Sequence, residues 1–184
     1  MKRGTRAVGV AESARESTSY LAGAVVGADS VVDGFVFGQC TVGGSDATAA
    51  ICRLWDRLDR EDARYVLLSG IAPAWFNVLD LQTIADYTDR PTVSVSFEAS
   101  PGLTDAIESA FSDPTVVADR LDTYRAQPER HRVAVGDETV FVRAVGLDAE
   151  EAADMVRAFT REGGRPEPLR VARLAARGYA DAER

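Results

Sequence analysis

The sequence has almost no lysine, histidine or cysteine, and it has no long apolar run. Lys2 is the only lysine among 21 basic residues, and His131 is the only histidine. These scarcities exclude a histidine-based triad, a zinc site and a disulfide framework, so we expect Cys40 and Cys52 to be buried structural residues. No segment approaches the ~20 apolar residues of a membrane span, and none resembles a signal peptide. The sequence therefore predicts a soluble, cytoplasmic protein without membrane association.

Acidic residues outnumber basic ones, 29 Asp and Glu against 21 Lys and Arg, which gives a formal net charge of −8. This balance disfavours a protein held on nucleic acid by bulk charge, because phosphate binding needs clustered Lys and Arg. Acid excess without lysine suggests adaptation to molar salt, where the Debye length is only ~3 Å; a GC-rich genome is the alternative. With 184 residues, 46% of them hydrophobic, the chain is expected to form a single domain over 1–184.

The order of the apolar patterns predicts a mixed α/β sheet. Three strands are expected first, at 6–10, 19–27 and 35–42, and their short connections predict antiparallel pairing. Alternating strands and helices then predict parallel βα units. Further strands are expected at 64–68, 91–96, 132–135 and 140–143, and helices at about 49–58, 76–87, 102–111, 115–126, 148–161 and 166–177. Antiparallel strands followed by βα units is the order of an RNase H-like sheet with helices on both faces.

Two acidic residues lie where predicted strands end. Asp46, in Gly43–Thr48, stands where a strand gives way to a helix. It is interpreted either as an N-cap worth ~1 kcal/mol or as a carboxylate held over the sheet edge as a metal ligand. Glu12 follows the first strand and is a weaker candidate.

The segment Leu67–Asp80 carries a second motif, in which a buried strand ends in the polar loop that starts at Ser69. Open α/β sheets place ligands at such strand ends. If a helix spans 76–87, Asn77 and Asp80 share one of its faces. Trp75 and Phe76 beside them are either core aromatics, the favoured interpretation, or a stacking platform.

Three arginines recur at helical spacing near the carboxyl end of the chain: Arg170, Arg173 and Arg177. They predict one basic stripe, which is either a solvated helix face with ordinary ion pairs or a face that binds anions or carboxylates.

Together these segments resemble the mostly archaeal domain-of-unknown-function 99 family, which is related to endonuclease V. Gly9–Ser13 matches its first motif loosely, whereas Gly44–Thr48, Ser69–Asp80 and Pro166–Ala172 match three others well. Combined with the acidic composition, the resemblance suggests a haloarchaeal member. It implies an RNase H-like fold and cleavage of DNA or RNA near deaminated bases such as inosine, with Mg²⁺ held by carboxylates.

The resemblance also implies which positions would hold the metal. The four ligand positions of the nuclease fall on Ala11, Asp46, Ser69 and Arg173, so Asp46 alone is kept. Glu12 is next to Ala11, but successive strand residues face opposite sides of a sheet. We hypothesise that the guanidinium of Arg173 occupies the space of the lost metal and pairs with Asp46 or Glu12.

Three functions follow as hypotheses. The favoured one is a catalytically degenerate relative that still binds nucleic acid or a nucleotide, through Ser69, Asn77, Arg170 and Arg173. The second is an active Mg²⁺-dependent endonuclease on inosine-containing strands, with a shifted catalytic site at Glu12, Asp46 and Asp80 and metal bound by Glu12 and Asp46. The third is a protein-interaction module that uses the fold as a scaffold.

Overall fold

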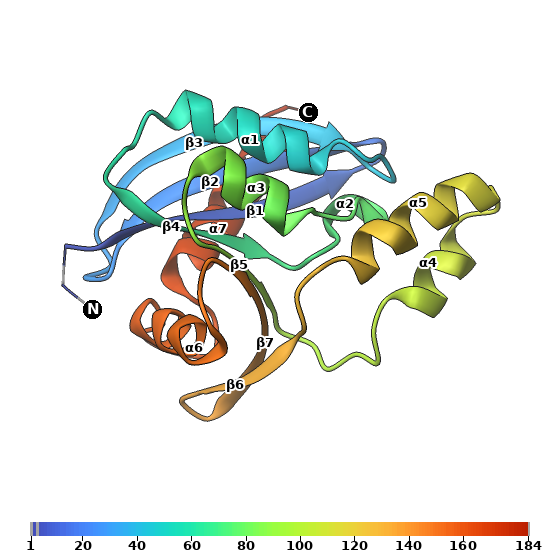
Figure 1. Cartoon of the computed structure of the whole chain (residues 1–184). Coiled ribbons are helices and arrows are strands. Elements are labelled where there is room, and N and C mark those ends of the chain that lie inside the picture. Colours follow the sequence, from blue (N-terminus) through green and yellow to red (C-terminus); the bar gives the residue numbers. More distant parts are fainter. Residues whose placement is uncertain (1, 3, 184) are drawn as a thin grey trace.

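The computed structural model describes residue 2 and residues 4–183 (Figure 1). The strands are β1 (Arg6–Arg15), β2 (Thr18–Gly27), β3 (Val32–Thr41), β4 (Ala63–Ser69), β5 (Thr92–Ser96), β6 (His131–Val135) and β7 (Glu138–Val145). The helices are α1 (Ala47–Leu58), α3 (Leu81–Thr88), α4 (Thr104–Ala110), α5 (Pro114–Arg125), α6 (Ala149–Ala158) and α7 (Glu167–Ala182), and a short turn is labelled α2 (Pro73–Phe76).

All the strands belong to one mixed sheet in the order β3-β2-β1-β4-β5-β7-β6. The β1, β2 and β3 strands pair antiparallel, β4 and β5 continue parallel to β1, and β7 and β6 close the other edge antiparallel. The predicted mixed sheet, with antiparallel strands before parallel βα units, is confirmed. The β1 strand extends five residues beyond its predicted end at residue 10, because its long hairpin with β2 pairs every residue through Arg15.

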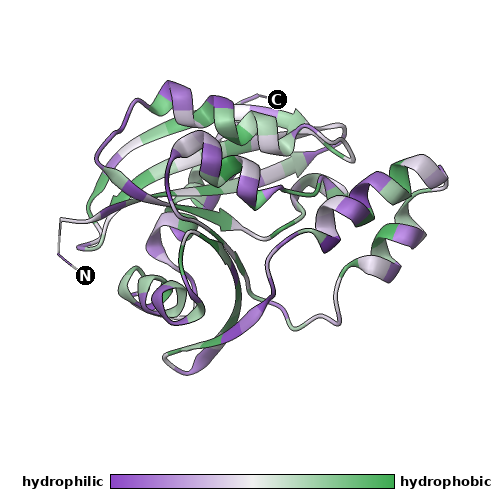
Figure 2. Cartoon of the chain, viewed as in Figure 1, coloured by the Kyte–Doolittle hydropathy of each residue, from purple (hydrophilic) through white to green (hydrophobic). Residues whose placement is uncertain are grey.

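Helices cover both faces of this sheet, as predicted (Figure 1). Alternate β1 residues serve the two layers: Val8 and Val10 join the core under α1 and α3, whereas Ala7 and Ala11 face the layer that contains α6 and α7. Figure 2 shows the apolar residues concentrated along the strands between these layers. The α7 helix packs directly on β1 at Gly9. The approach is so close that a Cβ atom on Gly9 would lie 2.2 Å from the carbonyl carbon of Pro168.

Two predicted helices differ from the structure by five residues at one end. The helix expected at 76–87 begins only at Leu81, because the chain before it forms a left-handed turn. The last helix continues past Gly178 to Ala182. Its extension is stabilised by Tyr179, whose ring packs edge-on against Tyr20 at 5.2 Å between centroids.

Cys40 and Cys52 are buried, as expected, and both are free; His131 is exposed. Asp148 caps α6, in a capping box with Glu151. Among the described residues, no helix combines the length and apolar character that a membrane crossing requires.

Candidate functional site

The candidate site lies where β1 and β4 run out, beside the loop that leads from β3 into α1. Glu12 points to the α1 side of the sheet, opposite to Ala11, which is buried against α7. One Glu12 carboxylate oxygen accepts a hydrogen bond from the Ser19 hydroxyl. The other lies 3.5 Å from the backbone nitrogen of Ala74, and Ser69 lines the same small cavity. The structure thus brings Glu12 and Ser69 together, but on the face that position 11 does not use.

Asp46 occupies the N-cap position of α1, yet its side chain does not cap the helix. Its carboxylate turns back and accepts hydrogen bonds from the backbone nitrogen of Thr41 at 3.0 and 3.2 Å, from the Thr41 hydroxyl at 3.0 Å and from Nδ2 of Asn77 at 2.8 Å. Burial alone would raise the pKa of Asp46, but these donors outweigh it and hold the pKa below its ordinary value. Asp46 is therefore a fixed negative charge.

Asn77 performs the capping that the sequence assigned to Asp46. It is fully buried, and its Oδ1 accepts from the backbone nitrogen of Ala47, at the start of α1, at 3.0 Å. Its Nδ2 also donates to the carbonyl oxygen of Thr41 at 3.0 Å. Asn77 lies outside any helix, so the predicted helical face shared with Asp80 is wrong. The side chain ties three segments together and has no free group for a ligand.

Asp80 is separated from this network. Its carboxylate caps α3, accepting from the Thr83 backbone nitrogen at 3.1 Å and from the Thr83 hydroxyl at 2.7 Å. Asp80 lines a different hollow of about 390 Å³, between α1, α3 and α5, together with Thr48 and Arg120. Its position is explained by helix capping.

Glu12, Asp46 and Asp80 do not form a ready metal centre. Among the described residues, no three His, Cys, Asp or Glu side chains come close enough to hold a metal ion. The Asp46 oxygens are occupied by three donors, and Ser69 offers a neutral hydroxyl where a carboxylate would be needed. These residues as arranged do not fit the oxygen cage that Mg²⁺ requires.

The charges of both carboxylates act on Cys40. Burial, followed by the charges of Asp46 and Glu12, raises the pKa of the Cys40 thiol to about 11. Both acids therefore act on one buried thiol at the end of β3, and the thiol stays protonated at neutral pH.

Trp75 was expected in the core, and it is instead 60% exposed. It is the middle residue of three consecutive non-glycine residues with positive φ, Ala74 at 51°, Trp75 at 59° and Phe76 at 57°. The turn is held at one end by Ala74, whose carbonyl oxygen accepts from the Gly43 backbone nitrogen at 2.7 Å. The indole lies over Gly43, since a Cβ atom there would be 3.6 Å from Cδ1 of Trp75.

Arg120, on α5, clamps the same turn, and nothing in its sequence context predicted this role. Its buried guanidinium donates to the carbonyl oxygens of Phe76 at 3.1 Å and Gly44 at 2.9 Å, and also to that of Gly43. The guanidinium lies 4.1 Å from the ring centroid of Phe111. Burial lowers its pKa, but arginine stays charged in proteins. The α4–α5 pair, which projects from the sheet in Figure 1, is thereby attached to the site loop.

The basic stripe on α7 divides into two parts. Arg170 forms a two-armed ion pair with Glu167 at 2.7 and 2.8 Å. Arg173 is exposed and makes no ion pair with Glu12 or Asp46 among the described residues, so the expected bridge to those acids is wrong. The physical reason is orientation: α7 covers the face of β1 opposite to Glu12.

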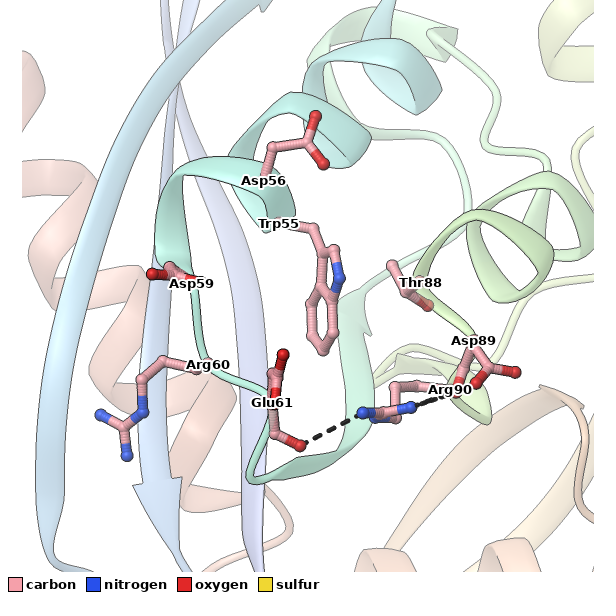
Figure 3. A pocket seen from close by; sticks show the side chains of 8 residues that line it. All are labelled: Trp55, Asp56, Asp59, Arg60, Glu61, Thr88, Asp89 and Arg90. Carbon is pink, nitrogen blue, oxygen red and sulfur yellow. Dashed lines mark hydrogen bonds and ion pairs between the residues drawn. The ribbon is translucent and has the colours of Figure 1, made fainter.

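A larger hollow of about 500 Å³ lies at the opposite end of the central strands, where α1 and α3 end (Figure 3). Its lining residues are Trp55, Asp56, Asp59, Arg60, Glu61, Thr88, Asp89 and Arg90. Arg90 lies 5.9 Å from the ring centroid of Trp55 and donates to the Glu61 carbonyl oxygen at 3.2 Å. The hollow shares no residue with the Glu12 and Asp46 network, so we do not assign the site to it.

With this geometry in place, the comparisons with known proteins identify the family. A family profile described as endonuclease dU matches residues 3–180. The chain belongs to the endonuclease dU family. Relatives called UPF0215 proteins include one from Thermococcus kodakarensis, 31% identical over 88% of this chain and 82% of its own, and one from Pyrococcus furiosus, 33% identical over 85% and 79%. The relatives come from several archaea, and a haloarchaeal origin of this member stays a prediction.

Comparison with solved structures shows that this member of the endonuclease dU family has the fold of endonuclease V. An Archaeoglobus fulgidus protein of unknown function superposes with a TM-score of 0.83 at 25% identity, covering 95% of this chain and 98% of its own. Endonuclease V from Streptomyces avermitilis superposes with a TM-score of 0.66 at 16% identity, covering 98% of this chain and 83% of its own. Endonuclease V from Ciona intestinalis, solved with inosine-containing DNA, superposes with a TM-score of 0.63 at 13% identity, covering 98% of this chain and 87% of its own. The predicted RNase H-like, endonuclease V-like fold is confirmed.

Proposed function

We propose that this protein binds single-stranded nucleic acid carrying a deaminated base, that the base stacks on Trp75, and that binding needs no metal ion. The observation that carries the proposal is the exposed indole on a left-handed turn beside Glu12 and Gly43. Base–aromatic stacking contributes about 1–3 kcal/mol per base and suits single strands, whose bases are accessible.

The backbone of the Trp75 turn supports a role for this side chain. Left-handed conformation costs a residue with a side chain roughly 1–2 kcal/mol, a cost that glycine avoids. Three such residues in a row persist because Arg120 and Gly43 hold the turn from outside. Strain of this kind concentrates at ligand clamps and active sites. A large exposed aromatic residue kept there against strain is consistent with a side chain that meets a ligand.

The chemistry of Glu12 supports a deaminated base as the target. Hypoxanthine and uracil carry a ring N–H at the position where adenine and cytosine carry an unprotonated nitrogen. A carboxylate only accepts hydrogen bonds, so at this ring position it can pair with the deaminated bases and not with adenine or cytosine. Among the described residues, one Glu12 oxygen has a single hydrogen-bond donor, the Ala74 nitrogen at 3.5 Å, and it can accept a further bond from a base. Asp46, by contrast, is fully engaged and stabilises the loop.

Relatives point to the same class of ligand. The Ciona endonuclease V was solved with DNA that contains inosine, and the family description names dU, which denotes deoxyuridine. We propose that the shared fold retains this class of ligand here, in a cytoplasmic protein.

Fluorescence anisotropy tests the proposal with labelled single strands that contain deoxyuridine or deoxyinosine, compared with cytidine or adenosine strands, all in EDTA. Trp75→Ala is expected to weaken binding about 5- to 150-fold, the equivalent of one stacked base. Tyr87→Ala is the matched control, because Tyr87 is another exposed aromatic residue, near the opposite end of the central strands. Equal affinity of wild type and Trp75→Ala would overturn the proposal. So would a wild type without preference for the deaminated strands, or a preference that Glu12→Gln leaves unchanged.

The family description favours a second candidate, a metal-dependent endonuclease. In that case ligand binding would have to rearrange Glu12 and Asp46, because the present arrangement leaves no open metal cage. Incubating the same strands with Mg²⁺ or Mn²⁺ distinguishes the two candidates. Cleavage that Asp46→Asn and Glu12→Gln both abolish would establish the nuclease, whereas binding without cleavage supports the proposed function.

A further inference from the structure

The α4–α5 pair shares a small hydrophobic core with the segment that follows Trp75, and this core is distinct from those on either side of the sheet. Its buried residues are Val78, Ile107 and Leu121. Phe76, the last residue of the left-handed turn, packs against this core, and so does Phe111 at the end of α4. The two helices that project from the sheet in Figure 1 therefore contact the turn directly.

A row of ring contacts leads from this core to the exposed indole. The ring centroid of Phe76 lies 6.3 Å from that of Phe111 and 5.4 Å from that of Trp75, and both pairs meet edge to face. Gly43 lies beside both ends of the row, since a Cβ atom there would be 3.6 Å from Cδ1 of Trp75 and 3.9 Å from Cε1 of Phe111. The indole is thus 60% exposed, yet it is connected through one intervening ring to the α4–α5 pair.

Arg120, on α5, supplies the polar part of the same connection. Its guanidinium donates to four backbone carbonyl groups, those of Phe76 at 3.1 Å, Gly44 at 2.9 Å, Val116 at 3.3 Å and Gly43. Phe76 closes the Trp75 turn, whereas Gly43 and Gly44 precede α1. One side chain therefore fixes the turn that carries the indole against the loop over which the indole lies.

The bonding of Arg120 contributes more to geometry than to stability. Its buried guanidinium has carbonyl dipoles as partners and forms no ion pair within the described residues. Desolvation offsets much of the attraction to those dipoles, so a buried charge held in this way is a weak source of stability. A planar guanidinium does fix the directions of the carbonyl groups that it bonds, because its five donors have set angles. Arginine is therefore well suited to holding the turn in one orientation.

We infer that Arg120 is a positioning residue for base binding at Trp75. It acts from α5 through the backbone of the turn and contacts neither base nor phosphate itself. An indole that is already held in its binding orientation does not have to be ordered when the base arrives, and such preorganisation raises affinity. The inference rests on the proposed function, and it assigns to the α4–α5 pair the task of keeping the Trp75 ring in place.

A double-mutant cycle tests whether Arg120 acts through Trp75. In the anisotropy titration with a deoxyuridine-containing strand, Arg120→Met is expected to weaken binding about 5- to 10-fold, the cost of ordering one side chain on binding. The double variant Arg120→Met/Trp75→Ala should bind within about twofold of Trp75→Ala alone, because the indole that Arg120 positions is already gone. The slope of log affinity against log salt should stay at its wild-type value. Losses that multiply in the double variant, or a slope smaller by ~0.7 as expected for one lost phosphate contact, would overturn the inference.

A second readout of the same role needs no nucleic acid. In the Trp55→Phe background Trp75 is the only tryptophan, and time-resolved fluorescence anisotropy measures how freely its ring moves on the nanosecond timescale. Arg120→Met should increase the amplitude of this local motion. If Trp75→Ala leaves strand binding unchanged, the proposed function fails, whereas the positioning of the ring by Arg120 is still decided here. An indole as rigid in Arg120→Met as in its parent would contradict the positioning role.

Arg125→Met is the matched control, since it removes the same charge from an exposed position of the same helix. It should match wild type in strand affinity and indole motion, and an effect equal to that of Arg120→Met would count against the inference. Arg120→Lys keeps the charge and three donors, so it should recover part of both the affinity and the rigidity.

Circular dichroism verifies that each variant folds. If Arg120→Met does not fold, Phe111→Leu tests the same connection, because it removes the ring that lies 4.1 Å from the guanidinium without removing a polar group. This variant is expected to increase the indole motion in the same direction, and unchanged motion would refute the connection.

Discussion

Replacing Trp75 by glycine is expected to leave a more stable protein than replacing it by alanine, the reverse of the usual order. Both variants lose the same indole, of which 60% is exposed, so roughly 100 Å² of buried apolar surface and ~2.5 kcal/mol are lost in each. They differ only in backbone energy. Position 75 has φ 59° and ψ 69°, where alanine costs roughly 1–2 kcal/mol and glycine nothing.

Glycine also gains more entropy on unfolding, which takes back about 0.5–1 kcal/mol of that advantage. The net expectation is that Trp75→Gly is more stable than Trp75→Ala by about 1 kcal/mol. Urea unfolding followed by circular dichroism measures the difference, and it corresponds to a shift of ~2–4 °C in melting temperature for a chain of this size.

The control for this comparison is Leu174, an exposed large residue in the right-handed helix α7. There the alanine variant should be the more stable, by about 1 kcal/mol. If alanine is equal to or better than glycine at both positions, the turn is not strained, and the argument that strain marks Trp75 as a ligand contact is wrong.

Three further predictions concern stability and reactivity. Asn77→Ala removes a buried side chain that makes three hydrogen bonds and should destabilise by about 2–4 kcal/mol in urea unfolding; a loss below ~0.5 kcal/mol would contradict its bridging role. Gly9→Ala should prevent close packing of α7 and lower the melting temperature strongly, while Gly178→Ala, with open space around it, should raise it slightly. Because the pKa of Cys40 is raised to about 11 from 9.0, the thiol favours folding while protonated, so stability should fall as pH rises from 9 to 11; native alkylation that is already fast at pH 8 would refute this.

The architecture followed from the sequence because its signals are local. The alternating pattern of the first three strands, the capping box at Asp148 and the change to βα spacing after residue 43 each have one dominant physical cause. The predicted ends of helices are wrong where a tertiary contact overrides the local preference. Gly178 is a normal helix stop, but Tyr179 gains more by packing on Tyr20 than the chain gains by ending the helix there.

The site was harder to predict, because its residues compete for partners that only the fold supplies. The local pattern allows Asp46 to be an N-cap or a metal ligand, but Asn77, thirty-one residues later, caps the helix, and Asp46 holds Thr41 instead. Trp75 reads as a core residue in an apolar segment, and no pattern marks a left-handed turn without glycine. Arg120 carries no motif, since its role depends on carbonyl groups that distant segments provide.

The central claim, that a base stacks on Trp75 without a metal ion, can be tested with a single intrinsic probe. The chain has two tryptophans, so Trp55→Phe leaves Trp75 as the sole indole fluorophore. Stacking against a nucleobase quenches indole emission. Titrating this variant in EDTA with a deoxyuridine-containing single strand should quench the fluorescence saturably, with the same midpoint as the anisotropy titration. Unchanged emission at strand concentrations that saturate binding would show that Trp75 does not contact the base and would contradict the account.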